Sequence, residues 1–169
     1  ATLSFIPIYG EFLSSDDRPG GNRLASQVIN SIFLLAVGVS LLAALAAPTL
    51  VSAPWGLGPH FPIEVQRLTA DLMRVLLLST ILFAISSILS GVLHAHQHFL
   101  LPAVSPIVYS LGVIFGALAL SPSLGILGLG WGAVAGAALH LGVQLPGLIR
   151  YRVRWSPGLG WADPALRRV

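Results

Sequence analysis

The sequence predicts an all-α protein that crosses a membrane several times, and three observations lead to this prediction. Of the 169 residues, 55% are hydrophobic and only 9% are charged, whereas soluble domains carry about 25% charged residues. No Asp, Glu, Lys or Arg occurs in residues 24–63 or in residues 75–149. A surface helix or strand of a soluble protein needs a polar face, which these two stretches do not provide. We therefore expect a bundle of transmembrane helices.

The shorter charge-free stretch and the residues before it predict two helices. Residues 1–13 are apolar and are expected to form the end of a preceding membrane helix. Residues 27–53 form the first complete span, which ends among the prolines and glycines between Pro48 and Pro59. Because a helix rises about 1.5 Å per residue, about 20 apolar residues cross a hydrocarbon core of about 30 Å, and this span is long enough.

The longer charge-free stretch predicts three further spans. The second complete span covers about residues 68–94, and the polar sequence His94–His98 predicts a turn after it. The third span covers about residues 102–120, with prolines near its start, where a missing N–H donor costs least. Ser121-Pro122-Ser123 predicts a tight turn, and the fourth span covers about residues 124–149. The chain is thus expected to be a single unit of four full spans and one partial span.

The arginines predict the orientation of these spans. Four crossings place residues 14–24, 94–100 and 150–169 on one side of the membrane. Since basic residues are enriched in cytoplasmic loops, the side with more arginines is expected to be cytoplasmic. Arg67 and Arg74 are on the opposite side. The seven arginines on the predicted cytoplasmic side are Arg18, Arg23, Arg150, Arg152, Arg154, Arg167 and Arg168.

The basic tail at residues 150–169 also bears on the partners of the chain. The sequence pI is near 10.2, but five of the nine arginines lie in the last twenty residues, directly after a long apolar stretch. The bias of basic residues toward membrane edges explains this position without nucleic acid. We expect Arg150, Arg152 and Arg154 to bind the anionic headgroups of membrane lipids, and we expect no nucleic-acid partner.

Glycines in the last two spans predict close helix packing. Gly112 and Gly116 are four residues apart, and Gly128, Gly132 and Gly136 repeat this spacing in the next span. In lipid, helices associate largely through close backbone contact over small residues. These glycines favour a tightly packed bundle, and they say nothing about what the bundle binds.

Six polar residues within or near the spans are the candidate functional residues. Polar groups at membrane depth face the interior of a bundle, where they bond across helices or line a wet cavity. Both interpretations stay open for Gln27, Asn30, His140 and Gln144. The other two candidates, Asp71 and Arg74, are three residues apart and are expected to form a local ion pair or a gate contact.

The histidines and serines of the chain raise two other kinds of chemistry, metal binding and hydrolysis. His94, His96 and His98 alternate, but only His94 and His98 would share a helix face and no carboxylate is nearby, so we expect no metal. We also expect no cofactor, and the absence of cysteine excludes disulfides and thiol catalysis. Ser90 with His140 is the candidate pair for an intramembrane serine hydrolase, although nothing marks an oxyanion hole.

Five segments, in order along the chain, resemble parts of one family of membrane proteins. Residues 5–12 (FIPIYGEF) resemble the Phe-x-Pro-x-x-x-Glu stretch that ends the second membrane helix of that family. Residues 91–103 (GVLHAHQHFLLPA) resemble its turn between helices 4 and 5, and residues 131–132 and 144–146 resemble parts of its sixth helix. Residues 163–169 (DPALRRV) resemble the cytoplasmic segment before its seventh helix. The family that these segments resemble is the MurJ/MviN family of lipid II flippases.

Three residues depart from the pattern of the family. His94 and Ser110 occupy positions where relatives often have Asn, and Leu78 occupies a position where many have Pro. The first two weaken any transfer of polar contacts from the family to this chain. The third predicts a straighter helix over residues 68–94.

The resemblance implies that the chain is an internal piece of a two-lobed transporter, covering part of the first lobe. Such a protein would move lipid II, the undecaprenyl-pyrophosphate-linked peptidoglycan precursor, from the cytoplasmic to the periplasmic leaflet of the bacterial inner membrane by alternating access. Its partners would be this lipid-linked precursor and the remaining helices of the same protein. The cationic cavity residues of the family would lie outside this chain. The alternatives are a related exporter of another polyprenyl-linked glycan or a drug, the hydrolase above, and a membrane scaffold without transport activity.

Overall fold

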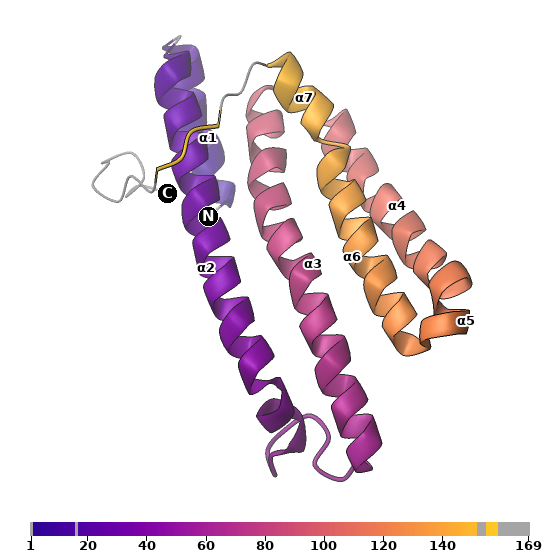
Figure 1. Cartoon of the computed structure of the whole chain (residues 1–169). Helices are drawn as coiled ribbons and strands as arrows, with labels where there is room; N and C mark the ends of the chain where they lie inside the picture. The colour runs from indigo at the N-terminus through magenta and orange to yellow at the C-terminus, as the bar shows by residue number, and fades with distance from the viewer. Residues whose placement is uncertain (1, 16, 152–154, 159–169) are drawn as a thin grey trace.

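The computed structural model describes residues 2–15, 17–151 and 155–158, and within them every regular element is a helix (Figure 1). The elements stand side by side and run alternately up and down. Their bounds are α1 Thr2–Ser14, α2 Arg18–Ser52, α3 Ile63–Ala95, α4 Leu100–Phe115, the π-helical segment η1 Gly116–Leu120, α5 Ser121–Leu124, α6 Ile126–Gly142 and α7 Leu145–Arg150.

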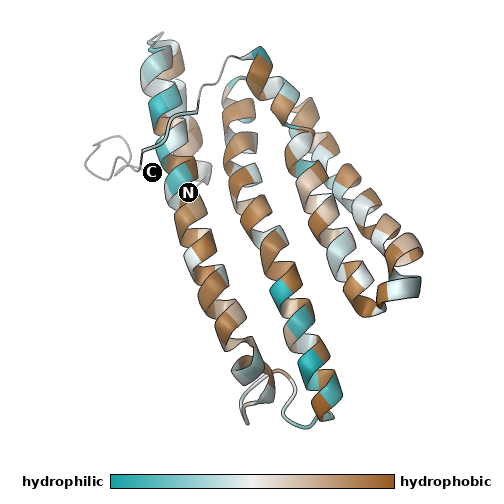
Figure 2. Ribbon diagram, viewed as in Figure 1, coloured by the Kyte–Doolittle hydropathy of each residue, from teal (hydrophilic) through white to brown (hydrophobic). Residues whose placement is uncertain are grey.

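Four stretches are long and apolar enough to cross a membrane, as the sequence predicts. They cover residues 19–52, 63–95, 100–124 and 126–150. Hydrophobic residues cover most of their length, and hydrophilic residues gather on the lower half of α3 (Figure 2). In the most apolar part of each stretch, between 11% and 33% of the residues are buried inside the chain. Most of the apolar side chains are therefore left to contact lipid or other helices.

Two helices begin earlier than expected. α2 begins at Arg18 rather than near residue 27, because Asp17 caps it by accepting a hydrogen bond from the backbone N–H of Gly20 at 3.0 Å. α3 begins at Ile63 rather than near residue 68. Hydropathy marks only the part of a helix that is embedded in lipid, whereas the helix itself continues into the polar layer until a cap or a proline stops it.

The reversal between the last two spans also lies later than expected. The sequence predicts a tight turn at residues 121–123, but these residues belong to the short helix α5. Pro122 lies in its first turn. The chain reverses at Gly125, whose φ of +61° is readily adopted by glycine. The last span is interrupted after Gly142 and continues as α7, so it is irregular near its end.

The three connections expected on one side of the membrane lie at one end of the bundle. The junction of α1 and α2, the turn between α3 and α4 and the end of α7 are at the top of Figure 1, which we call the α1–α2 end. The loop between α2 and α3 and the helix α5 lie toward the opposite end, which we call the α2–α3 end. This arrangement agrees with four crossings in alternating directions.

The largest apolar core lies near the α1–α2 end, where α1 packs against α2 and α3. Its buried residues come from these three helices and from α7. They are Phe5, Ile8, Tyr9, Leu24, Ala25, Val28, Ile88, Leu89, Val92, Leu93 and Leu148.

The glycine spacing predicted close packing, and the contact between α4 and α6 confirms it. A methyl group added to Gly112 would overlap the Cα of Gly136, and one added to Gly116 would overlap the Cα of Gly132. The two backbones are therefore in direct contact along this seam. α3 is an uninterrupted α-helix over 33 residues, and its straightness stays a prediction.

Candidate functional site

A network of four polar side chains joins α3 to the last span. Ser86 and Ser90 are one turn apart on α3, and His140 and Gln144 are one turn apart on the last span, so each pair shares a helix face. The Ser86 Oγ lies 2.7 Å from His140 Nδ1, and Gln144 Nε2 donates to Ser86 Oγ at 2.7 Å. The Ser90 hydroxyl donates to Gln144 Oε1 at 3.0 Å. The network lies between hydrophobic stretches, where an unpaired polar group is costly.

The hydrogen bonds of this network satisfy both ends of the Gln144 amide. Gln144 accepts from Ser90 through Oε1 and donates to Ser86 through Nε2. The Ser86 hydroxyl oxygen accepts from Gln144 and shares a second hydrogen bond with Nδ1 of His140, whose direction depends on the tautomer of the imidazole. Both Ser86 and Gln144 are completely buried. The network therefore satisfies the amide of Gln144 without water.

The structure does not form the pair that the hydrolase hypothesis needs. Ser90 bonds to Gln144, and the serine that contacts His140 is Ser86. Ser86 is itself 0% exposed, so no substrate carbonyl reaches its hydroxyl in this structure. The sequence does not reveal which serine contacts His140, because Ser79, Ser86, Ser87 and Ser90 are spaced along one helix and no local signal tells which of them faces the last span.

Asn30 contacts the described part of the tail. Its side-chain nitrogen donates to the backbone carbonyls of Ser156 at 3.1 Å and Gly158 at 2.8 Å, and its Oδ1 accepts from the indole of Trp155 at 2.8 Å. The backbone N–H of Ser156 also donates to the hydroxyl of Ser26 at 3.0 Å. Residues 155–158 are thus attached to the first half of α2.

The tail arginines are only partly placed. Arg150 ends α7 and is exposed. Arg152, Arg154, Arg167 and Arg168 lie outside the described residues. The predicted contacts of Arg150, Arg152 and Arg154 with lipid headgroups therefore stay predictions.

Gln27 is buried without a partner for its carbonyl oxygen. The residue is 8% exposed, and its Oε1 makes no hydrogen bond within the described part of the chain. The hydroxyl of Ser31, one turn later on α2, is in the same condition. These two atoms form an unsatisfied polar pair on one face of α2.

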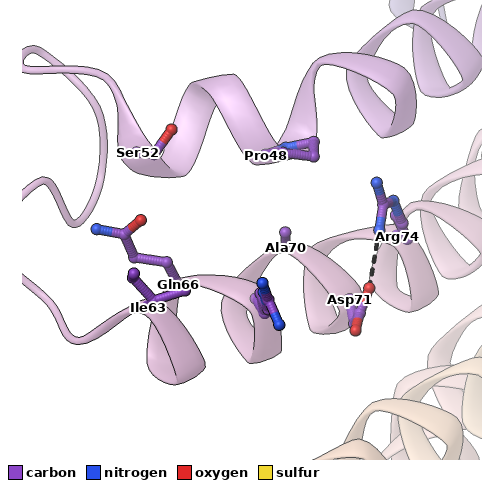
Figure 3. Close-up of a pocket in the computed structure, with 8 residues that line it drawn as sticks. Pro48, Ser52, Ile63, Gln66, Ala70, Asp71 and Arg74 are labelled. Atoms are coloured by element: carbon purple, nitrogen blue, oxygen red, sulfur yellow. Dashed lines mark hydrogen bonds and ion pairs between the residues drawn. The ribbon is translucent and has the colours of Figure 1, made fainter.

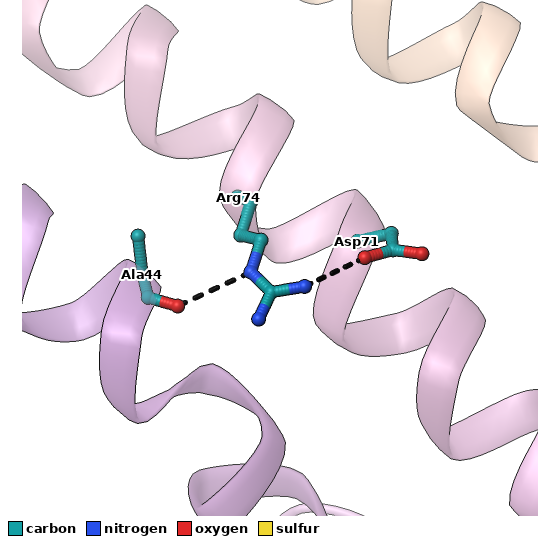
Figure 4. A network of polar contacts seen from close by, with 3 residues as sticks. All are labelled: Ala44, Asp71 and Arg74. Carbon is teal, nitrogen blue, oxygen red and sulfur yellow. Dashed lines mark hydrogen bonds and ion pairs between the residues drawn. The ribbon is translucent and has the colours of Figure 1, made fainter.

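Asp71 and Arg74 form the ion pair that their spacing predicts, near the α2–α3 end. Arg74 Nη1 lies 2.8 Å from Asp71 Oδ1, and Arg74 Nε donates to the backbone carbonyl of Ala44 on α2 at 3.2 Å (Figure 4). In an α-helix the carbonyl of Ala44 would accept from residue 48, but Pro48 has no N–H. Arg74 therefore satisfies a carbonyl that a proline has left without its usual donor, a role that sequence spacing along one helix does not reveal.

Two histidines near the α3–α4 turn, His96 and His98, contact tyrosine rings in tilted or edge-on geometry. The rings of His96 and Tyr151 have centroids 4.3 Å apart, and His96 also lies 5.8 Å from the ring of Tyr9. His98 lies 6.1 Å from Tyr151. Within the described residues, no group of three His, Asp or Glu side chains is placed to hold a metal ion. The histidines instead join the α3–α4 turn to α1 and to the end of α7.

The six candidate residues therefore do not converge on one site. Gln27 and Asn30 lie near the α1–α2 end of α2, and Asp71 and Arg74 lie near the other end of the bundle. Among the described residues, two pairs of candidates are joined by hydrogen bonds. His140 and Gln144 form one pair, and Asp71 and Arg74 form the other.

Comparison with known proteins decides the family. A family model described as "Lipid II flippase MurJ" matches residues 2–169. The chain belongs to the MurJ lipid II flippase family. The match covers every described helix, so the buried network, the Asn30 contacts and the Asp71–Arg74 pair all lie within the MurJ region. With its four membrane-crossing stretches, the chain is part of a multi-pass membrane protein.

Curated relatives carry the same family name. The chain is 26% identical over 172 residues to a probable lipid II flippase MurJ of Buchnera aphidicola, covering 98% of this chain and 33% of the relative. It is 25% identical over 147 residues to the lipid II flippase MurJ of Burkholderia cenocepacia, and 25% identical over 155 residues to a probable MurJ of Rhizobium tropici, each time covering 86% of this chain and 28% of the relative. The chain thus spans about a third of the length of these MurJ relatives.

Proposed function

We propose that this chain forms part of a flippase that moves lipid II from the cytoplasmic to the periplasmic leaflet of the bacterial inner membrane. The observation that carries the proposal is the MurJ family match over residues 2–169. The relatives named as lipid II flippases support the same substrate. Transport would proceed by alternating access, in which two helical lobes rock around a central cavity and no covalent bond of the lipid is broken.

The distribution of arginine supports the orientation that we propose. Residues 14–24, 94–100 and 150–169 would lie in the cytoplasm, since seven of the nine arginines belong to these segments. The α1–α2 end of the bundle would then face the cytoplasm, and the α2–α3 end would face the periplasm.

We propose that this chain forms a wall of the transport cavity rather than its binding centre. A pyrophosphate group is best held by cations, above all by arginine. Residues 24–63 and 75–149 carry no Arg or Lys. The arginines that hold the pyrophosphate would therefore come from other helices of the complete protein, whereas this chain would supply apolar surface and a few polar contacts.

Four of the six candidate residues would have different roles in this wall. His140 and Gln144 would hold α3 and the last span together, so that the two helices move as one body during transport. Asn30 would position the residues that follow α7. Gln27 is the best candidate for a polar contact with the substrate or with a helix outside this chain, because its buried carbonyl oxygen has no partner among the described residues.

Genetic complementation tests the proposed function. The full-length gene that encodes this chain is expressed in a bacterium whose own lipid II flippase can be switched off, and a copy with an early stop codon serves as the control. We expect the full-length gene to restore growth and cell shape, and the control to allow lysis. Lysis in both strains, with the full-length protein present in the membrane, would contradict the proposal.

A further inference from the structure

A pocket of about 410 Å³ lies between α2 and α3 near the α2–α3 end (Figure 3). α2 forms one side of it and the first three turns of α3 form the other. The residues that line it are Pro48, Ser52, Ile63, Gln66, Arg67, Ala70, Asp71 and Arg74.

The pocket lies where the polar part of the bundle meets its apolar part. The charged residues of α3 are confined to positions 64–74, and no charged residue follows before position 150. The hydrophilic stretch on the lower half of α3 in Figure 2 is this segment. Exposed apolar side chains lie on both helices nearby, including Leu45 on α2 and Ile63 on α3. A molecule in this pocket would thus contact both the headgroup layer and the hydrocarbon.

Two arginines are among the residues that line the pocket, and the side chain of one of them is held in place. Arg67 and Arg74 are seven residues apart and therefore share a face of α3. The contacts of Arg74 with Asp71 and with the carbonyl of Ala44 fix its side chain. Arg67 makes no hydrogen bond or ion pair within the described part of the chain. The small side chain of Ala70 lies between the two arginines in sequence and leaves space in the pocket.

The net charge of the pocket favours an anion, and one of its walls is held in place by hydrogen bonds. Two arginines against the one carboxylate of Asp71 leave a net positive charge, and Glu64 does not line the pocket. The wall on the loop side is fixed, because Gln66 Nε2 donates to the carbonyls of Gly58 at 3.1 Å and Phe61 at 3.0 Å.

We propose that this pocket binds the phosphate group of a membrane lipid in the leaflet at the α2–α3 end. Guanidinium groups bind phosphate oxygens through charge-assisted hydrogen bonds. Arg67 would donate through all the N–H groups of its guanidinium. Arg74 would donate through the N–H groups that do not contact Asp71 or the carbonyl of Ala44. The acyl chains would lie against the exposed apolar side chains of α2. Asp71 would oppose the lipid phosphate and so limit the affinity.

Lipid retention on the purified full-length protein tests this proposal. The protein is extracted in detergent and incubated with phosphatidylglycerol, with diacylglycerol, which lacks the phosphate, or with inorganic phosphate, and bound molecules are counted by native mass spectrometry. We expect retention of phosphatidylglycerol and not of diacylglycerol. Displacement of phosphatidylglycerol by millimolar phosphate would show that the pocket recognises a free ion, which would overturn the lipid assignment.

Three variants make the test specific to this pocket. Arg67→Gln should lower phosphatidylglycerol retention by roughly threefold, the effect of losing one exposed charge contact. Asp71→Asn should raise it, because it removes the opposing charge and frees an edge of Arg74. Arg23→Gln removes an exposed arginine at the opposite end of the bundle and should change nothing. Equal retention in the wild type and all three variants would overturn the proposal. The measurement involves no transport, so its outcome is independent of the function proposed above.

Discussion

Single hydroxyl groups decide how α3 and the last span recognise each other. Ser86 and Ser87 are neighbours in the sequence, but the Ser86 hydroxyl contacts His140 and Gln144, whereas the Ser87 hydroxyl donates to the carbonyl of Ala84 in its own helix. The sequence identified His140 and Gln144 as polar residues at membrane depth, because such residues are rare there. It did not identify Ser86, because choosing among several serines requires the rotation of one helix against another, which local sequence does not encode.

The two neighbouring serines provide a matched pair of variants. Ser86→Ala should lower the free energy of unfolding by about 1 kcal/mol, because it leaves Gln144 Nε2 and His140 Nδ1 without their shared partner. Ser87→Ala should leave it nearly unchanged. Denaturation of the full-length protein in mixed micelles, followed by circular dichroism, measures both values. Equal losses in the two variants would show that the network does not stabilise the helix contact.

The contact between Arg74 and α2 predicts a coupling between two residues on different helices. Arg74→Met should destabilise the wild-type protein, since the carbonyl of Ala44 then lacks a donor. Pro48→Ala restores an N–H within α2, so Arg74→Met should cost less in that background. A double-mutant cycle on unfolding free energies should give a coupling of about 1 kcal/mol. A coupling near zero would mean that Arg74 does not act as the substitute donor.

At the scale of helices, the spans followed from the sequence and their ends did not. The absence of charge in residues 24–63 and 75–149 was sufficient to predict four membrane crossings, because lipid imposes this composition directly. The ends of α2 and α3 were misplaced because both helices extend into the polar layer, where hydropathy gives no signal. The reversal at Gly125 was misplaced because Ser121-Pro122-Ser123 is typical of a tight turn, whereas proline is also accepted in the first turn of a helix, where Pro122 lies.

A glycine in the seam between α4 and α6 and a glycine outside it should respond differently to replacement by alanine. Gly132→Ala should destabilise the protein by about 2 kcal/mol, because the new methyl group overlaps the backbone of Gly116. Gly38→Ala, on a part of α2 where nothing lies within 4 Å, should be neutral or stabilising by up to about 1 kcal/mol, because alanine favours the helix. The micelle denaturation used for the serine variants measures both. A neutral Gly132→Ala would contradict the close packing.

For the whole molecule, α3 is the element that joins the others. It packs against α1 and α2 on one side and against α6 on another, and it carries both the buried network and the Asp71–Arg74 pair. The family and the topology could be predicted from sequence, because ordered motifs and charge-free spans survive without three-dimensional information. The division of the six candidate residues among separate places could not, because it depends on which helices become neighbours.

The proposed orientation is testable with single cysteines introduced into this chain, which contains none, after any cysteine elsewhere in the full-length protein is replaced by serine. Gln97→Cys, in the turn between α3 and α4, should react with a membrane-impermeant maleimide only after the cells are opened. His60→Cys, in the loop between α2 and α3, should react in intact cells whose outer barrier has been made permeable. The reverse pattern would contradict the orientation derived from the arginines.

The central claim is that this chain forms part of a protein that moves lipid II across the membrane. The most direct measurement is the fraction of lipid II that an added lipid II-cleaving enzyme reaches from outside, in cells that depend on the full-length gene. This fraction should fall toward zero as the gene product is depleted, while total lipid II rises inside the cell. An accessible fraction that stays constant through complete depletion would contradict the claim.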